Sequence, residues 1–214
     1  MGVLDKAVGL LATLEGGPLA LADLVRAVDL PRATTHRLAV ALEDHGLVRR
    51  DGDGRFTLGL RLVALGRAAA DAFPLAAAAR PALEALRDRT GESVQLYVAE
   101  GDRRRCVVSL QSPHGLRWIV PEGALLPIDR GSAGKLLGVR PQPGPEGWTE
   151  SVEEREPGVC SVSAPVRDGR AAVVAAVSVS GPVERLSRAP GQRFGAAVVA
   201  AAAEVAAAAS ASAR

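Results

Sequence analysis

The chain contains only two cysteines, Cys106 and Cys160, among 214 residues. They are too few and too far apart in sequence for a disulfide framework or a zinc site, so we expect two reduced, buried thiols. The three histidines, His36, His45 and His114, also lack the spacing of metal ligands. The sequence therefore predicts neither a metal nor another cofactor.

An export signal is absent as well. The first residues, MGVLDKAVGLLATLEGG, mix charge among the apolar side chains and have neither a basic start nor a cleavage site. The C-terminal run 195–213 is mostly alanine and contains Glu204, which favours an amphipathic or packed helix over a membrane span. We expect a cytoplasmic protein with no membrane partner.

Lysine is scarce, since Lys6 and Lys135 are the only two. Ser132 and Lys135 match the S-x-x-K part of a penicillin-binding serine enzyme, but the chain has no K-T-G and no S-D-N. A phosphate loop fails too, because Leu136 follows Lys135 and Asp129 stands where a glycine is required. No nucleophile, base and orienting acid come together, so we expect no enzymatic activity.

Arginine supplies almost all of the positive charge, and it can hold phosphate or guanine through two hydrogen bonds. The net charge is only +2, so any basic surface has to be local. The 48% hydrophobic content is enough for real cores, and the length allows one large or two modest domains.

Residues 21–59 have the pattern of a DNA-reading head. The apolar spacing of 21–28 predicts a helix, and Pro31 ends the turn that separates it from a second helix starting near Arg32. Thr35, Leu38, Ala39 and Leu42 would pack that second helix against the first. The opposite face, at the positions that meet bases and phosphates in a helix-turn-helix, carries Arg32, Ala33, Thr34, His36 and Arg37.

A hairpin follows directly, with two short strands predicted within 47–59 around the turn Asp51-Gly52-Asp53-Gly54. Arg49, Arg50 and Arg55 flank that turn as the arginines of a wing would. Two helices and a tight turn are also a common packing unit, so the arginine-flanked hairpin is what favours DNA binding.

The remaining chain predicts an α+β sensor-like domain. Helices are expected over 3–15, 60–72 and 75–89, and the apolar stripe of 60–72 requires either its own head or a second subunit as a partner. Strands are expected over 94–98, 105–111, 116–120, 159–167 and 171–180, with a short helix in 131–138, a loop over 140–158 and a last helix from 192. The predicted divisions are a DNA-binding domain 1–59, a linker helix 60–74 and an effector-binding domain 75–214.

Serines at a spacing of two occur on both of the last strands, as Ser161 and Ser163, and as Ser178 and Ser180. Period two places each pair on one face of its strand. If the hairpin register aligns the faces, the hydroxyls line one concavity that suits a small polar ligand. The alternative is that these serines decorate a solvent face.

Several blocks of the chain resemble the IclR family of transcriptional regulators. They are VLDKAVGLLATLE, the stretch LADLVRAVDLPRATTHRLAVALEDHGLVRRDGDGRFTLGLRL, TGESVQLYV, GSAGKLL, EREPGVCSVSAPV and AAVSVSGPVERLSR. Within the family, VLDKA, GESVQLY and EREPGV are most similar to the actinobacterial regulators of leucine and other amino-acid biosynthesis, the NdgR/LtbR type.

The resemblance implies a winged helix-turn-helix, a linker helix and a GAF-like α/β effector domain with an antiparallel sheet. It also implies a homodimer or dimer of dimers on palindromic double-stranded operators near metabolic genes, with a small-molecule effector such as an amino acid or a small organic acid. The implied effector residues are Trp118, Ser132, Ala133, Val159, Ser161, Ser178 and Ser180.

One segment departs from the family pattern. The family usually has a longer, partly helical excursion between the GK loop and the EREPG block, and this chain has only 139–155. That excursion helps to cover the pocket, and Ser151 matches a pocket position only if the alignment has no gap there. The competing hypothesis is a small-molecule-binding or thiol-sensing module whose N-terminal head mediates protein contacts.

Overall fold

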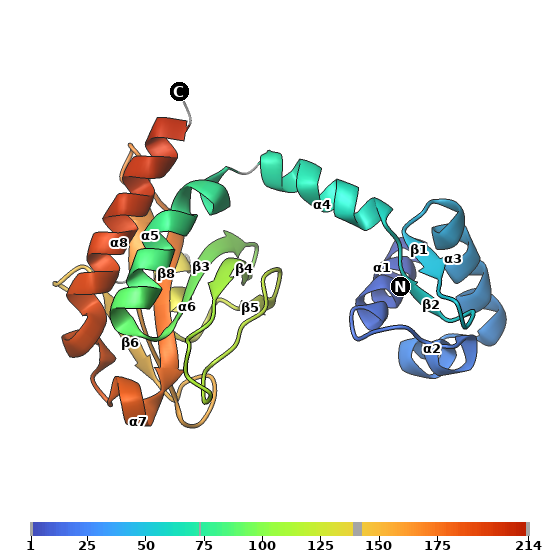
Figure 1. Cartoon of the computed structure of the whole chain (residues 1–214), viewed down its shortest axis with the longest axis horizontal. Helices are drawn as coiled ribbons and strands as arrows, with labels where there is room; N and C mark the ends of the chain where they lie inside the picture. Colours follow the sequence, from blue (N-terminus) through green and yellow to red (C-terminus); the bar gives the residue numbers. More distant parts are fainter. Residues whose placement is uncertain (1, 73, 139–142, 213–214) are drawn as a thin grey trace. The chain divides into compact units, whose positions relative to one another are not determined.

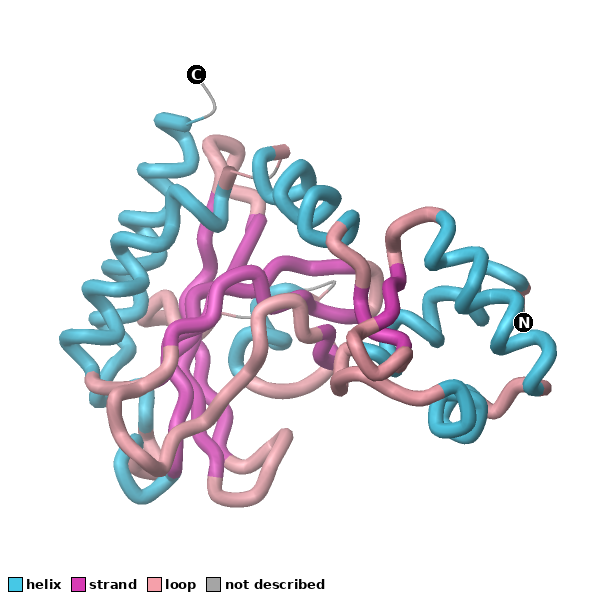
Figure 2. The backbone as a smooth tube through the Cα atoms, turned by 45° about the vertical axis from the view of Figure 1, so that its right-hand side comes forward, coloured by secondary structure: helices cyan, strands magenta, loops and turns pink. Residues whose placement is uncertain are grey.

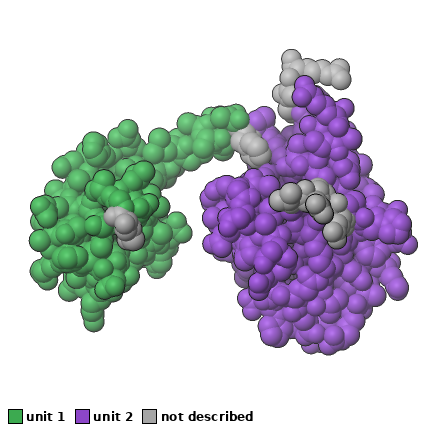
Figure 3. All heavy atoms as spheres, turned by 180° about the vertical axis from the view of Figure 1, so that it is seen from behind, with its two compact units in different colours: residues 1–73 green, residues 74–214 purple. Residues whose placement is uncertain are grey.

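The computed structural model describes residues 2–72, 74–138 and 143–212, and these form two compact units. One unit covers Met1–Phe73 and the other Pro74–Arg214 (Figure 3). Phe73, at the end of the predicted linker helix, and residues 139–142 of the shortened segment lie outside the described residues.

The first unit is a winged helix-turn-helix, as predicted. Its elements are α1 (Val3–Leu14), α2 (Leu21–Val28), α3 (Arg32–Asp44), the strands β1 (Val48–Arg50) and β2 (Phe56–Leu58), and α4 (Arg61–Asp71) (Figure 1). The apolar stripes of the first three helices and the inner face of the hairpin form one core, which consists of Leu10, Leu14, Leu24, Ala39, Leu42, Val48 and Phe56. Helix α4 buries no residue in this core.

The second unit is built on a six-stranded antiparallel sheet in the order β5-β4-β3-β8-β7-β6. The strands are β3 (Ser93–Glu100), β4 (Arg103–Leu110), β5 (Leu125–Pro127), β6 (Thr149–Val152), β7 (Val159–Arg167) and β8 (Val173–Pro182). The helices are α5 (Leu75–Thr90), α6 (Ser132–Leu137), α7 (Val183–Leu186) and α8 (Pro190–Ser212). An antiparallel sheet with helices on its faces confirms the predicted α+β class.

The two faces of this sheet have different coverings. Helices α5 and α8 pack on one face over the larger apolar core, and the strands, magenta in Figure 2, run alongside the long C-terminal helix. The other face holds α6 and a smaller apolar cluster around Tyr97 and Leu136. Because successive side chains of a strand point to opposite faces, the serines of β7 and β8 lie on the α6 side.

A bulge in β4 changes which of its side chains reach the α6 side. Leu96 pairs with Val108 but Tyr97 pairs with Cys106, so Val107 is an extra residue in β4. An extra residue reverses the alternation beyond it. Val108 therefore belongs to the α5–α8 core, whereas Cys106 belongs to the cluster beneath α6.

Two of the strand and loop predictions were wrong. Residues 116–120 form no strand, although Trp118 and Val120 pack inward, because the strand that pairs with β4 on that edge is β5. The predicted loop 140–158 contains β6, which pairs with β7 from Thr149 opposite Ser163 to Val152 opposite Cys160. Alternating burial alone does not identify the pairing partner of a strand.

Helix α8 is long and apolar enough over Pro190–Ala211 to cross a membrane. Packing explains its apolar composition without a membrane, because Phe194, Val198 and Val205 are buried in the core between α8 and the sheet. A helix of this kind is a packed core helix, which was one of the two forms predicted for this segment.

Candidate DNA-reading surface and ligand pocket

The turn between α2 and α3 is fixed by its backbone and by one buried hydroxyl. Asp29 has a φ of 49°, in the left-handed region that aspartate tolerates in turns. Thr35 is fully buried, and its Oγ1 donates a hydrogen bond of 3.3 Å to the carbonyl oxygen of Pro31. With Ala39 and Leu42 also buried, α3 turns one defined face away from α2.

The solvent face of α3 holds the predicted DNA-reading side chains together at its first two turns. Arg32, Ala33, His36 and Arg37 are exposed, and Thr34 is half-buried. The guanidinium of Arg37 donates to the carbonyl oxygen of Ala33 at 3.3 Å, which directs it along the helix toward its N-terminus. That these residues contact DNA remains a prediction.

The wing turn is held by its own charges. The carboxylate of Asp51 accepts bonds from the amides of Asp53 and Arg55 at 3.0 and 2.9 Å, and from Arg55 Nε at 2.8 Å. Desolvation alone would raise the pKa of Asp51, but the hydrogen bonds from Arg55 and from the Asp53 amide lower it below its usual value. Arg55 thus orders the turn and also meets Asp53 at 3.0 Å.

The three wing arginines therefore differ in their partners. Arg50 pairs with Glu43 at 3.2 Å and lies 4.2 Å from the centre of the Phe56 ring. Arg49 is exposed and forms no ion pair within the described residues of the chain. Of the three positive charges, that of Arg49 is the least compensated.

The serine rows of β7 and β8 align. Ser161 pairs directly with Ser180, and Ser163 with Ser178. Ser132, the first residue of α6, has its Oγ 2.7 Å from the Oγ atoms of both Ser161 and Ser163. The hydroxyls of Ser132, Ser161 and Ser163 thus form a connected group between β7 and α6, and Ser163 is fully buried within it, while Ser180 donates to Gln95 Oε1 at 2.8 Å.

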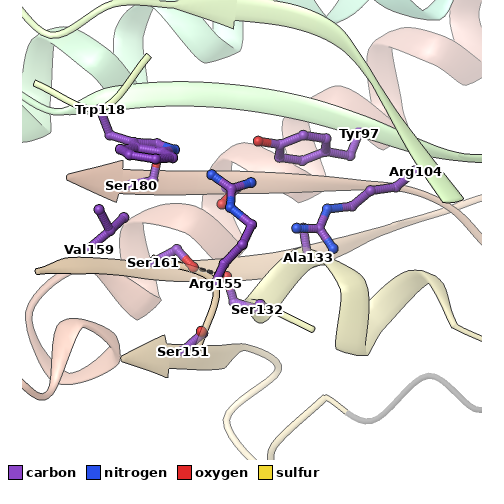
Figure 4. Close-up of a pocket in the computed structure, with 12 residues that line it drawn as sticks. Tyr97, Arg104, Trp118, Ser132, Ala133, Ser151, Arg155, Val159, Ser161 and Ser180 are labelled. Atoms are coloured by element: carbon purple, nitrogen blue, oxygen red, sulfur yellow. Dashed lines mark hydrogen bonds between the residues drawn. The ribbon is translucent and has the colours of Figure 1, made fainter. Parts of the chain in front are cut away.

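A small cavity lies beside this hydroxyl group, with about 30 Å³ of free space that is partly open to solvent (Figure 4). All seven residues predicted for the effector pocket line it, namely Trp118, Ser132, Ala133, Val159, Ser161, Ser178 and Ser180. The other lining residues are Tyr97, Arg104, Gly131, Ser151 and Arg155. That an effector binds here is not tested by this geometry and remains a prediction.

Arg104 was missed by sequence reasoning because the β4 bulge puts it on the pocket face. Its side chain is 3% exposed, and its Nη1 donates to the carbonyl oxygens of Pro127 and Arg130, the latter at 2.7 Å. Burial, and after it the nearby charge of Arg155, lowers the pKa of Arg104.

Arg155 was also missed, since nothing in the local pattern shows that it points inward. Its guanidinium lies 5.0 Å from the centre of the Trp118 ring and beside the hydroxyl of Tyr97 (Figure 4). A cation over the face of tryptophan is an attractive contact. The side chain rises from the segment that links β6 and β7 into the middle of the cavity.

The backbone on either side of Arg155 is anchored by two glutamates. Glu153 accepts a bond of 2.9 Å from the Gly158 amide and pairs with Arg188 at 3.0 Å. Glu154 accepts a bond of 3.1 Å from the Gly131 amide and forms an ion pair with Lys135. The backbone position of Arg155 is therefore set by the contacts of Glu153 with Gly158 and Arg188, and by those of Glu154 with Gly131 and Lys135.

Ser132 and Lys135, the residues of the S-x-x-K pattern, do not bond to each other but have other partners. Lys135 Nζ bonds to Glu154 and to the carbonyl oxygen of Glu150, the latter at 3.1 Å, while Ser132 bonds to the serines of β7. The lysine is thus engaged with groups other than the hydroxyl it would have to activate.

The two cysteines are buried, as predicted. Cys106 donates through its thiol to the carbonyl oxygen of Val108 at 3.3 Å, and burial raises its pKa to about 12. Burial also raises the pKa of Cys160. Thiols react as thiolates, so neither environment favours a reactive cysteine.

Family models match most of the chain. The model described as "IclR helix-turn-helix domain" matches residues 3–52, and "Bacterial transcriptional regulator IclR C-terminal" matches 67–143 and 139–207. Among curated relatives, the glycerol operon regulatory protein of Streptomyces coelicolor is 30% identical over 86% of each chain. The transcriptional repressor IclR of Escherichia coli is 26% identical over 89% of this chain and 83% of its own.

Solved structures share the fold at lower identity. An IclR homolog from Microbacterium hydrocarbonoxydans, complexed with 4-hydroxybenzoate, gives a TM-score of 0.80 at 22% identity and covers 97% of this chain and 98% of its own. The Thermotoga maritima IclR gives 0.74 at 20% identity, covering 95% and 96%. Both solved structures thus extend over nearly the whole chain.

Proposed function

The chain belongs to the IclR family of DNA-binding transcriptional regulators, and we propose that it controls a metabolic operon in response to a small-molecule effector. A protein in this role is a regulator rather than an enzyme, and we place it in the cytoplasm with its DNA. The proposal rests on one observation: the same chain has an exposed helix face with arginines in its first unit and a polar cavity in its second.

For the DNA end, we propose that the exposed face of α3 enters the major groove of a palindromic operator. Arg32, Ala33, Thr34, His36 and Arg37 would then meet base edges, while Arg49, Arg50 and Arg55 meet the backbone. Phosphate contacts contribute affinity, whereas base contacts contribute specificity. Among the wing arginines, Arg49 should contribute most to the electrostatic part of the affinity, because it forms no ion pair within the described residues.

For the effector end, we propose that the cavity beneath α6 binds an amino acid or a small organic acid. The connected serine hydroxyls both donate and accept hydrogen bonds, which suits a small polar ligand. An effector shifts the population between operator-competent and incompetent arrangements only if it binds them unequally.

We further propose that the protein acts as a homodimer, or a dimer of dimers, through its first unit. Val3, Leu4 and Val8 of α1 are 72%, 72% and 56% exposed, and Leu60 and Val63 beside and on α4 are 74% and 52% exposed. Exposed apolar side chains on two helices of one unit are typical of a surface that a second copy covers. A palindromic operator requires two such heads.

The target pathway we propose is amino-acid biosynthesis. This rests on the blocks VLDKA, GESVQLY and EREPGV, which resemble the actinobacterial branch with that role. The glycerol operon regulator among its relatives makes carbon-source genes the alternative outcome of a genomic experiment.

Selection of bound fragments from sheared genomic DNA tests the proposal. We expect enrichment of a palindrome upstream of metabolic genes. Arg37→Ala should lose about 5-fold to 150-fold in affinity for it, since one good base contact contributes about 1–3 kcal/mol. No enrichment at moderate salt would contradict DNA binding and favour a head that contacts proteins. Ala41→Ser, on the exposed side of α3 but a full turn beyond Arg37, serves as the matched control.

A further inference from the structure

The cavity beneath α6 is lined by two positively charged side chains, and the carboxylate that acts on one of them, Asp129 on Arg104, does not line it. The guanidiniums of Arg104 and Arg155 both belong to its lining, and none of the described lining residues is acidic. Like charges near each other in a partly dry site are unfavourable, and here the proximity of Arg155 contributes to the lowered pKa of Arg104. The charge of the site is therefore unbalanced.

Three carboxylates near these arginines are engaged elsewhere: Glu153 and Glu154, which directly precede Arg155, and Asp129, whose charge acts on Arg104. Glu154 binds Lys135 and the Gly131 amide, and Glu153 binds Arg188 and the Gly158 amide. Asp129 pairs with Arg130 at 3.3 Å. None of these three can turn to Arg155 without losing its present partners.

The cavity also has an excess of hydrogen-bond donors. Within the described chain, the buried Nε of Arg104 and the buried Nε1 of Trp118 have no acceptor. Both residues line the cavity. A buried donor without an acceptor is costly, so a ligand that supplies acceptors would relieve two such costs.

The side chain of Arg155 occupies the middle of the cavity, so a bound ligand would contact it. Figure 4 shows its side chain between Trp118 on one side and Arg104 with Ala133 on the other. Its backbone is anchored by the two preceding glutamates, so the guanidinium is presented rather than free to leave with its segment. A ligand that enters must either pair with this guanidinium or displace it from Trp118.

We propose that Arg155 selects the effector by charge, and that the pocket binds a compact dicarboxylate in preference to a monocarboxylate or a zwitterionic amino acid. One carboxylate pairs with Arg155 in front of Trp118, and the other faces Arg104 and the serine hydroxyls. An ammonium group has no carboxylate to meet in this cavity. The inference rests on the proposed function in one respect, that this cavity is the effector site.

The test measures binding of matched four-carbon acids to the full-length protein by titration calorimetry. Succinate carries two carboxylates, butyrate one, and 4-aminobutyrate a carboxylate and an ammonium; malonate and glutarate cover shorter and longer spacings. We expect one of the dicarboxylates to bind at least tenfold more tightly than both single-carboxylate acids, since a charge-assisted bidentate pair contributes about that much.

Substitutions at Arg155 test whether the dicarboxylate preference depends on its guanidinium. Arg155→Gln should remove the dicarboxylate preference, and Arg155→Lys should keep part of it, because lysine retains the charge but not the planar fork. Arg170→Gln, in the exposed turn between β7 and β8, is the matched control and should bind as the unaltered protein does. A thermal melt and operator binding without ligand show whether Arg155→Gln is folded.

The outcomes separate the inference from the proposed function. If no dicarboxylate is preferred, or if Arg155→Gln keeps the preference while it still binds operator DNA, the inference is overturned and the regulator remains. If the preference depends on Arg155 but no DNA is bound, the inference stands and the proposed function falls.

Discussion

The three arginines of the wing have the same charge but differ in their ion-pair partners. Arg55 is committed to Asp51 and Asp53, and Arg50 to Glu43, whereas Arg49 has no such partner in the described chain. The charge that remains available to phosphate is therefore concentrated on Arg49.

This difference predicts unequal effects on operator binding. Arg49→Ala should lower the slope of log affinity against log salt by about one unit, since one phosphate contact is lost. Arg55→Ala should change that slope by clearly less, because two carboxylates already compensate its charge. Fluorescence anisotropy over a salt series measures both slopes, and equal reductions would show that the internal ion pairs are broken on DNA.

Glu154 makes the segment that presents Arg155 sensitive to acid. Desolvation alone would raise its pKa, but the hydrogen bonds from Lys135 and from the Gly131 amide lower it below the usual value. A lowered folded-state pKa contributes stability above the unfolded-state value near 4.5 and loses it as the pH falls through the folded-state pKa.

We therefore expect the melting temperature to fall more steeply below about pH 5 in the unaltered protein than in Glu154→Gln, whose amide does not titrate. Calorimetric scans from pH 7 to pH 3 measure the difference. Glu156→Gln, exposed two residues away, controls for the loss of one negative charge. Parallel curves for the unaltered protein and Glu154→Gln would argue against a stabilising role of this ion pair.

At the scale of elements, the glycines of α8 accommodate a tryptophan. A Cβ on Gly195 would lie 2.5 Å from Trp148 Nε1, and one on Gly191 would lie 2.0 Å from its ring. Trp148 directly precedes β6, so this contact secures the shortened segment against the last helix.

Alanine at two helical glycines should thus have opposite effects. Gly195→Ala should lower the free energy of unfolding by about 1–3 kcal/mol, since the tryptophan must move. Gly9→Ala in α1, where a Cβ meets nothing within 4 Å, should raise it by about 0.5–1 kcal/mol through helix propensity. Urea titrations measure both, and a stable Gly195→Ala would mean that Trp148 does not depend on this site.

The sequence predicts the strands β7 and β8 of the pocket better than it predicts β4 or the segment that carries Arg155. Period-two spacing correctly places Ser161 and Ser163 on one face of β7, and Ser178 and Ser180 on one face of β8, while the register that brings Ser161 opposite Ser180 comes from the structure. The same spacing misplaces Arg104, because the bulge at Val107 leaves no mark in the local pattern. The spacing does not reveal the direction of Arg155 either, because that direction depends on the ion pairs of its neighbours Glu154 and Glu153 with Lys135 and Arg188, which are distant in sequence.

At the scale of the molecule, the exposed apolar side chains of α1 and α4 predict an assembly. Leu65 is 50% exposed on a helix that buries nothing in its own unit. Placing a charge there should cost little in a monomer but should disrupt an apolar interface.

We expect Val63→Asp with Leu65→Asp to shift the protein toward the monomer in sedimentation velocity and to reduce operator affinity by at least tenfold, because one head then binds alone. Arg67→Asp, an exposed change on the same helix that starts from a polar residue, is the comparison. A dimer that survives the double change would place the subunit contact on another surface.

The bulge in β4 marks a position at which the protein should tolerate a deletion. Val107 is one residue more than the pairing with β3 needs, and the strand absorbs it without moving Arg104 or Val108 off their faces. Deleting Val107 would restore a regular strand that keeps both residues where they are. The gene can therefore lose this codon while the pocket retains its chemistry.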